Sequence, residues 1–450
     1  MQHIKPLRNV LLHVALGIIA YAFESLMLGY MLLVLGYWVF RILTKTNKHK
    51  EILMAAAYIT GAEVFFRMTG AYILYETAKY AVILFSLFGI FFYGFRYNAV
   101  SYLIYILVLF PGVLVSLENI GYDVNFRIAV LFNLSGPLTL GAISLYCYGR
   151  SIKFKDFLEV LDMLVMPLIA TTVYIFIYAP NLRELVTGTA SNAALSGGYG
   201  PNQVATVLGL GAFILYSRFF IPYKNKLVHL VMLFFMVLMA YRALVTFSRG
   251  GVLVAGVMMV VFSVVLYFST GIRTKVKMSF KLFTLVFIGV AVWSLALLQT
   301  GGMIGNRYEN KDALGREKED VTTGRAELFK TEFETFEENA FFGIGVGNVK
   351  FEFEDELGQA VASHNEISRM LSEHGFFGII ALLILIFVPL LSKLSGRNNI
   401  YFYPFMVFWF LTIAHSSMRI AAPAFIYGLA LLNIEYKEKK QPTVHKKISK

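Results

Sequence analysis

The sequence predicts an all-α polytopic membrane protein, and three observations lead to this prediction. Hydrophobic residues make up 58% of the 450 residues and charged residues only 15%, which is more apolar surface than a water-soluble chain of this length can bury. Apolar runs of about 16 to 23 residues recur along the chain, and this is the length that a helix needs to cross a bilayer. Basic residues gather in alternate loops between the runs, as the positive-inside rule requires.

The apolar runs define fourteen predicted spans, within a range of twelve to fourteen, each bounded by polar or basic residues. The first run follows Lys5 and Arg8 and is succeeded at once by the second, so we expect a retained helix and not a cleaved signal peptide. In order, the spans lie at residues 9–24, 26–43, 52–68, 71–93, 98–116, 126–148, 157–179, 203–222, 227–248, 251–270, 281–300, 373–394, 400–415 and 418–434.

The loops between the spans predict an orientation. Placing the N-terminus in the cytoplasm puts 25 of the 40 Lys and Arg residues on the cytoplasmic side, with the C-terminus there as well. The chain then divides into N-terminal helices, helices that carry polar motifs, one long outer loop, and C-terminal helices with a basic tail. These parts are residues 1–200, 201–300, 301–372 and 373–450.

The long outer loop predicts three structural features. Residues 321–339 read as an amphipathic helix, with Leu328, Phe329, Phe333 and Phe336 on roughly one face. GIGVGN, at 343–348, reads as a glycine-rich turn. Ser363 and Glu366 have the spacing of a capping box, which predicts a new helix that starts at His364.

Several polar motifs fall on the predicted outer face. Charged groups are costly near lipid, so their gathering at one level favours a functional site over loops that are polar only because they are exposed. The motifs are GGYGPNQ at 197–203, TFSRGG at 246–251, TGR at 323–325, GIGVGN at 343–348, SHNE at 363–366 and HSSMR at 415–419.

Two arginines near TFSRGG are candidate anion ligands. Arg242 and Arg249 are seven residues apart, so we expect them to share a helix face with Thr246 between them. An arginine at the depth of Arg242 needs an anionic partner, which is either a ligand or an internal carboxylate such as Glu63 or Glu76. Arg249 precedes two glycines, which would let a ligand approach closely.

His364 is the candidate general base. In the first turn of a helix the positive end of the dipole keeps an imidazole neutral, as a base must be at pH 7. Arg325, in the first turn of its own predicted helix, adds positive potential for an anion. We expect His374 to be a helix-end residue, and His415 and Arg419 to support the site.

Other classes of chemistry lack their motifs. The sequence has no D-x-D pair, no H-E-x-x-H and no Walker loop, so we expect neither a metal nor a cofactor. The net charge of +12 is dispersed over short loops, which argues against nucleic acid as a partner. An arginine-rich outer site suits an anionic, membrane-borne substrate such as a lipid diphosphate.

In their order, PNQ, SRGG, TGR before a helix, GIGVGN, and SHN followed by E-x-G resemble the O-antigen ligase and O-antigen polymerase family of bacterial membrane glycosyltransferases. The resemblance covers roughly residues 195–395. It implies a GT-C-like helical bundle in the bacterial cytoplasmic membrane. It also implies transfer of a glycan from an undecaprenyl diphosphate carrier to an acceptor on the outer face, without a nucleotide sugar.

By motif, the resemblance implies that Arg249 and Arg325 hold the diphosphate and that His364 is the essential loop histidine. The expected substrate contacts are Arg242, Asn202, Gln203, Asn365, Ser248 and Arg419. The acceptor is another lipid-linked glycan in a polymerase, with a chain-length regulator as a partner, and lipid A core or a protein in a ligase. Fourteen spans favour the polymerase, and a flippase for the same lipid-linked glycan is the alternative from another class.

Overall fold

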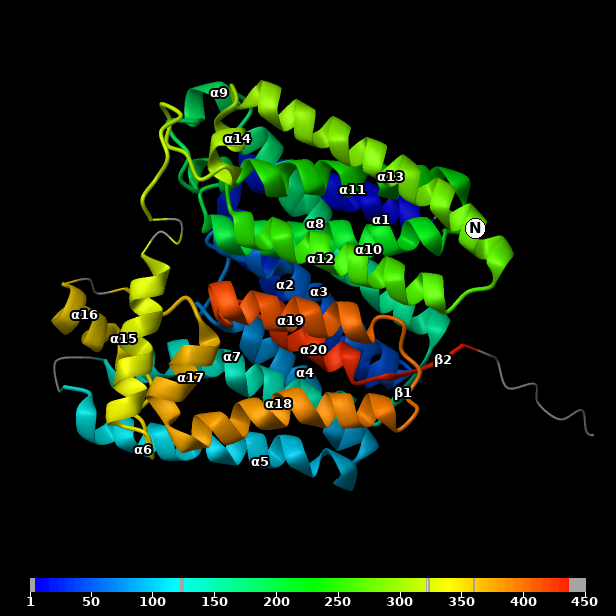
Figure 1. Ribbon diagram of the computed structural model, residues 1–450. Coiled ribbons are helices and arrows are strands. Elements are labelled where there is room, and N and C mark those ends of the chain that lie inside the picture. Colours follow the sequence, from blue (N-terminus) through cyan, green and yellow to red (C-terminus); the bar gives the residue numbers. More distant parts are fainter. Residues whose placement is uncertain (1–4, 122–124, 321, 323, 359–360, 437–450) are drawn as a thin grey trace, which may run out of the picture.

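A computed structural model describes residues 5–121, 125–320, 322, 324–358 and 361–436. Long helices run side by side in one bundle, and the helices of the long loop lie across one end of it (Figure 1). The fold is therefore the all-α polytopic membrane class that the composition predicts. The predicted basic tail at 437–450 and Thr323 of TGR lie outside the described residues.

The elements follow in chain order. The first half holds α1 (Lys5–Ala22), α2 (Met27–Thr44), α3 (Lys48–Met68), α4 (Thr77–Tyr93), α5 (Val100–Val108), α6 (Phe110–Asn119), α7 (Phe126–Cys147), β1 (Ser151–Lys153), α8 (Phe154–Tyr178), α9 (Leu182–Leu185) and α10 (Pro201–Phe220). The second half holds α11 (Lys226–Val245), α12 (Arg249–Phe268), α13 (Ile272–Gln299), α14 (Met303–Tyr308), α15 (Arg325–Glu338), α16 (Val349–Leu357), α17 (Glu366–His374), α18 (Phe376–Leu394), α19 (Phe402–Ser416), α20 (Ala422–Ala430) and β2 (Asn433–Glu435).

Every predicted span overlaps a helix, but the number that cross a membrane stays a prediction. Among the described residues, nine helical segments are long and apolar enough to cross, and three apolar helices are shorter. The predicted span at 98–116 divides into α5 and α6 at Leu109. The predicted span at 418–434 is helical only over the nine residues of α20, which is roughly 14 Å of helix.

The interior is organised around α3, whose residues from Glu51 to Arg67 are all buried. Helix α3 packs on α8 and α4. The approach to α8 is close at Gly61, where an added Cβ atom would lie 2.2 Å from the carbonyl oxygen of Leu164. Small residues allow such backbone contact, which gives the dispersion contacts that hold membrane helices together.

A two-stranded parallel sheet fastens the end of the bundle opposite the long loop. Strand β2 pairs with β1 in the register Ile434 to Ile152. The all-α prediction did not include these strands. They fix the segment after α20 against the connection between α7 and α8.

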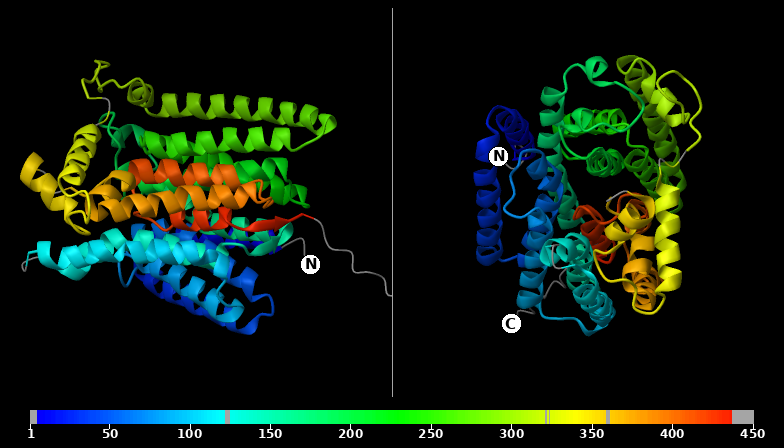
Figure 2. Two further views of the ribbon diagram at one scale, coloured as in Figure 1. Left: turned by 60° about the horizontal axis from the view of Figure 1, so that its bottom comes forward. Right: turned by 90° about the vertical axis from the view of Figure 1, so that its left-hand side faces the viewer.

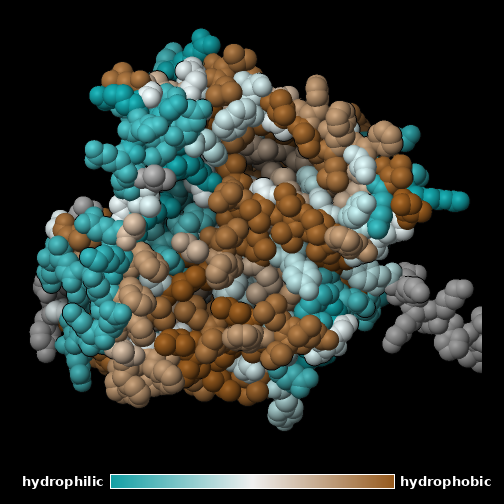
Figure 3. All heavy atoms as spheres, viewed as in Figure 1, coloured by the Kyte–Doolittle hydropathy of each residue, from teal (hydrophilic) through white to brown (hydrophobic). Residues whose placement is uncertain are grey.

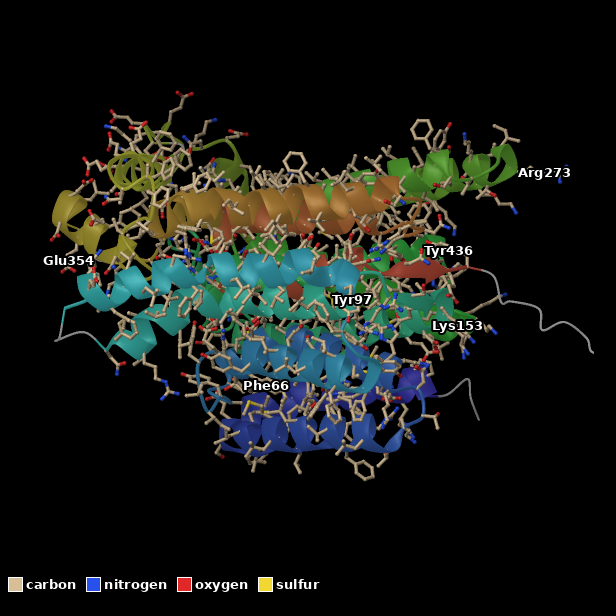
Figure 4. All side chains as sticks on the ribbon, turned by 90° about the horizontal axis from the view of Figure 1, so that it is seen from below. Phe66, Tyr97, Lys153, Arg273, Glu354 and Tyr436 are labelled. Carbon is tan, nitrogen blue, oxygen red and sulfur yellow. The ribbon has the colours of Figure 1, made fainter. Side chains whose placement is uncertain are left out.

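The surface shows the polarity that a bilayer requires. In the face seen in Figure 3, an apolar belt over the long helices lies between hydrophilic ends. Glu354 marks the end that carries the loop helices, and Lys153 and Arg273 mark the opposite end (Figure 4). The long loop and the basic connections therefore lie at opposite ends of the bundle.

This separation predicts the result of cysteine labelling in a Cys147→Ala background. We expect a thiol reagent that does not cross the cytoplasmic membrane to label Glu354→Cys in intact cells, because the positive-inside rule places the acidic loop outside. Arg273→Cys should react only after the membrane is opened. Both positions are exposed in the structure, so labelling of Arg273→Cys but not Glu354→Cys in intact cells would reverse the orientation.

Candidate functional site

The PNQ and SRGG motifs meet, as the sequence analysis expected. The hydroxyl of Ser248 donates a hydrogen bond to Oδ1 of Asn202 over 2.8 Å. Asn202 lies in the first turn of α10, and Ser248 is the residue before α12. Gln203 is half-buried beside them, and its Oε1 lies 2.2 Å from the position that a Cβ atom on Gly200 would take.

The expectation that Arg242 and Arg249 share a helix face is wrong. Helix α11 ends at Val245, and Phe247 has a positive φ of 60°, so the chain turns sharply before α12 begins at Arg249. The amide of Ser248 is held in this turn by the hydroxyl of Thr246 over 3.1 Å. The two arginines therefore belong to different helices.

Arg242 lies inside the protein, and its pairing with Glu63 or Glu76 is also wrong. One nitrogen of its guanidinium donates to the carbonyl of Ala179 over 3.1 Å, and the guanidinium carbon lies 3.9 Å from the centre of the Phe176 ring. Its Nε and Nη1 have no hydrogen-bond partner in the described part of the chain. Glu63 and Glu76 bind Arg67 and Lys79 instead.

The two glycines of SRGG serve helix packing. A Cβ atom on Gly251 would lie 2.6 Å from the amide nitrogen of Thr206 in α10. One on Gly250 would lie 2.3 Å from Cδ2 of His415 in α19. The absent side chains let α10 and α19 approach the start of α12, and the close approach of a ligand to Arg249 stays a prediction.

His364 precedes a helix, and the predicted capping box is wrong. Helix α17 begins at Glu366, and its N-cap is Asn365, whose side chain accepts from the amide of Ile367 over 2.9 Å. Ser363 instead exchanges hydrogen bonds with the backbone of Asn365. Asparagine suits an N-cap as well as serine does, and the side chain of Glu366 is used by Arg369.

Arg419 fixes the backbone next to His364. One guanidinium nitrogen donates to the carbonyl oxygens of Ala362 and Ser363 over 2.8 and 2.7 Å. The carbonyl of Arg419 in turn accepts from Arg67 over 3.0 Å. Arg67, a buried residue of α3, therefore fixes the turn at Arg419, and Arg419 fixes the segment that carries His364. These contacts give the predicted supporting role of Arg419 a structural basis.

A cationic cluster forms where these motifs converge, and we define it as Arg249, Arg307, Arg325, Arg419 and His364. Burial and the positive charges of Arg249 and Arg325 lower the pKa of Arg307. Burial and Arg249 likewise lower the pKa of Arg325, which begins α15 as predicted. These effects place the three guanidinium groups within range of electrostatic interaction, because repulsion between such groups falls with distance.

His364 shares this environment. Burial and the charges of Arg419, Arg325 and His415 lower its pKa to about 4. Its Nδ1 is buried and has no hydrogen-bond partner in the described ranges. The imidazole is therefore neutral at pH 7 with a lone pair available.

Arg307 is the member of the cluster that sequence reasoning missed. It lies in α14, directly after the long helix α13, and its Nε donates to the carbonyl of Phe247 over 3.1 Å. It thereby contacts the strained turn that begins α12. The available signal was an arginine within a few residues of a predicted span on the outer side.

The polar side chains of α17 form a buried ion-pair group. Arg369 is paired with Glu366 one turn before it and with Glu373 one turn after it. Glu366 also accepts from the amide of Met418 over 3.3 Å, and Glu373 accepts from the amide of Gly347 over 2.9 Å. The density of polar residues before α18 is therefore explained by interior pairing that joins three parts of the loop end of the bundle.

GIGVGN packs behind the cluster and connects α6 to α17. The amide of Val346 donates to the carbonyl of Gly112 over 3.2 Å, and the hydroxyl of Ser116 donates to the carbonyl of Val346 over 3.0 Å. Gly345 has a φ of 89°, and a Cβ atom there would lie 2.7 Å from the amide nitrogen of Ser116. The glycines are required by this packing. His374, at the end of α17 as expected, is buried beside Gly112.

Residues 234–383 match the family model described as O-Antigen ligase. The matched region begins in α11 and ends in α18, so it contains SRGG, α14, α15 and the His364 segment. The comparison with curated proteins gave no match. The family match confirms the resemblance that the motifs predicted, and it supports a membrane glycosyltransferase of the O-antigen ligase and polymerase type.

Glu332 gives a pH-dependent prediction. It is 2% exposed and accepts a hydrogen bond from Ser368, and burial raises its pKa to about 7. The folded state therefore holds this proton more tightly than the unfolded state does, so stability falls as the pH rises from about 4.5 to 7. We expect Glu332→Gln to reduce the loss of apparent melting temperature between pH 5 and pH 8, measured in detergent micelles.

The control is Glu334→Gln, on the exposed side of the same helix, which should leave the wild-type difference unchanged. An equal loss in wild type and in Glu332→Gln would show that this carboxyl does not titrate between the two pH values.

Proposed function

We propose that this chain, whose residues 234–383 match the O-antigen ligase family, transfers a glycan from a lipid diphosphate to an acceptor hydroxyl. The acceptor oxygen forms a bond to the anomeric carbon, and the bond from that carbon to the diphosphate oxygen breaks. The diphosphate leaves with the electron pair, and the acceptor proton passes to a base. The reaction takes place at the end of the bundle where the loop helices lie.

The cationic cluster is the observation that carries this proposal. Arg249, Arg307 and Arg325 come from three separate helices, yet, together with burial, Arg249 and Arg325 lower the pKa of Arg307, and Arg249 lowers the pKa of Arg325. Keeping like charges together costs free energy, which a bound dianion would offset. The forked donors of arginine match phosphate oxygens, and the negative charge on a leaving diphosphate grows in the transition state.

His364 suits the role of the base. Its neighbours keep it neutral, and its buried Nδ1 has no partner among the described residues. Arg419 holds the preceding carbonyls, so the imidazole is presented from a fixed backbone. When the diphosphate binds, its negative charge would raise the pKa of His364 towards neutrality, which improves proton transfer from a hydroxyl.

Two cavities support a separate acceptor site. One of about 400 Å³ is lined by Phe132, Asn133 and Ser363, among others. The second, of about 540 Å³, shares Phe132 with it and reaches Tyr75. Ser363 is the neighbour of His364, and volumes of this size accommodate small ligands. Aromatic and amide side chains are suited to sugar rings, which present C–H faces and hydroxyl edges.

The number of spans does not decide between polymerase and ligase. Fourteen spans favoured the polymerase, but nine described helices meet the length and composition that crossing requires. We therefore propose the reaction that both enzymes share. In either case the acceptor is an amphiphile, and Ile128, which lines both cavities, is 66% exposed on the outer part of α7.

Lysine substitutions test the arginines. We expect Arg249→Lys, Arg307→Lys and Arg325→Lys each to lose most glycan transfer, because an ammonium group keeps the charge but not the forked donation. The measurement is long-chain surface glycan on a gel after complementation of a null strain, with the protein level checked by immunoblot. Arg316→Lys, at an exposed pair with Asp312, is the control and should keep full transfer. Full activity in all three variants would show that these arginines contribute only a general positive potential and not forked hydrogen bonding.

Replacement of His364 tests the base. His364→Gln keeps a hydrogen-bonding side chain but cannot take a proton near pH 7, so we expect transfer to fall by about 10²–10⁴-fold. The same complementation assay applies. His229→Gln, at the start of α11 on the opposite end of the bundle, should behave as wild type. A full glycan ladder from His364→Gln would make the histidine a positioning group.

A further inference from the structure

Helix α15 lies along the edge of the bundle. In the side view it crosses the ends of the long helices nearly at right angles to them (Figure 1). In the end-on view of Figure 2, on the right, it runs along the periphery towards the start of α18. Its 14 residues span roughly 21 Å. A helix in this position lies parallel to the surface of any membrane that surrounds the bundle.

The buried side of α15 is not its most apolar side. Thr331, Glu332 and Thr335 are buried against the rest of the protein, where Ser368 of α17 binds Glu332. Phe329 and Phe333 are 46% and 41% exposed. Leu328, on the same predicted face, packs against a small apolar cluster, and Phe336 is half-buried. Only Phe329 and Phe333 remain open on that face. Packing within the protein therefore does not account for them.

The exposed phenylalanines of α15 continue into a larger surface. Phe341 and Phe342, which follow the helix, are 60% and 50% exposed, and Phe376 is 47% exposed. The ring of Phe341 stacks on that of Phe376 with 6.1 Å between their centres and 7° between their planes. We define the phenylalanine face as these five exposed rings: Phe329, Phe333, Phe341, Phe342 and Phe376.

The depth of this face is set by α18. Phe376 is the first residue of α18, which is apolar enough to span a membrane with a mean hydropathy of 2.5. Its side chains Phe387 and Leu391 are 53% and 60% exposed, as expected for contact with lipid. The stacked ring of Phe341 therefore lies at the level where the lipid-facing surface of α18 begins.

We propose that the phenylalanine face binds the lipid bilayer, with α15 lying in the outer surface of the membrane. The helix has the character of an interfacial helix, because Glu327, Glu334 and Glu338 lie about 100° or more around its axis from Phe333. Aromatic side chains favour this depth because the ring is apolar and the surroundings are wet. The long loop is thus anchored on lipid and is not a domain immersed in water.

The charges of α15 argue against electrostatic attraction as the reason for membrane binding. Within α15 five glutamates face one lysine and one arginine, so anionic headgroups would not attract the helix. Contact then depends on the apolar rings, and it should be independent of anionic lipid content and of salt. The proposal does not depend on which reaction the cationic cluster performs.

Site-directed spin labelling of the full chain in phosphatidylcholine nanodiscs tests the proposal. Single cysteines replace Phe333 or Phe342 in a Cys147→Ala background, with Glu334→Cys and Glu338→Cys as controls at exposed positions turned away from Phe333. We expect the labels at 333 and 342 to be reached several-fold better by oxygen than by a water-soluble nickel chelate, relative to the controls. Addition of phosphatidylglycerol should not change this ratio.

Two results would overturn the proposal. Labels at 333 and 342 that nickel reaches as readily as it reaches the controls would place the face in water. Labels shielded from both reagents would show that protein, such as a second copy of the chain, covers it. Size-exclusion chromatography of each labelled variant confirms that the fold is retained before the comparison is made.

Discussion

The pairing of Arg369 with two carboxylates is the interaction on which the loop end of this protein depends. An unpaired guanidinium in the interior of a membrane protein is strongly unfavourable, and Arg369 is 2% exposed. Glu366 and Glu373 neutralise it and accept hydrogen bonds from the backbone amides of Met418 and Gly347.

The same arginine donates to the carbonyl of Asn133 in α7. One buried ion-pair group thus joins α17 to three other segments and fixes where the chain emerges towards His364.

The charges of the cationic cluster are arranged in the opposite way. Around Arg369 each positive charge has a carboxylate, whereas Arg307, Arg325 and Arg419 lie where burial and neighbouring arginines lower their pKa values. The first arrangement gives a rigid framework, because its charges are satisfied within the fold. The second gives a strong positive potential at a fixed position, which is the property that an anionic substrate requires. The turn at Arg419 belongs to both, since Arg67 and Glu63 of α3 hold its backbone.

Much of the site was predictable, and the errors share a cause. The meeting of PNQ with SRGG and of HSSMR with SHNE could be expected, because these motifs fall at the same end of consecutive spans. Arg325 was correctly expected to begin a helix. The shared face of Arg242 and Arg249 and the capping role of Ser363 were wrong. Each assumed that a local pattern acts alone, whereas a sharp turn and a competing asparagine cap took precedence.

The sequence by itself determined that the chain is a bundle of apolar helices with its acidic loop and its basic connections at opposite ends. Hydropathy and charge act residue by residue over the length of a membrane, so they can be read from the sequence without knowing which residues are in contact. Tertiary structure decided that Arg307 joins the cluster, that Arg242 stays inside, and that the phenylalanines of α15 remain exposed. Those outcomes depend on which surfaces meet between residues far apart in the chain. Periodicity can identify a face of a helix, but it cannot say what covers that face.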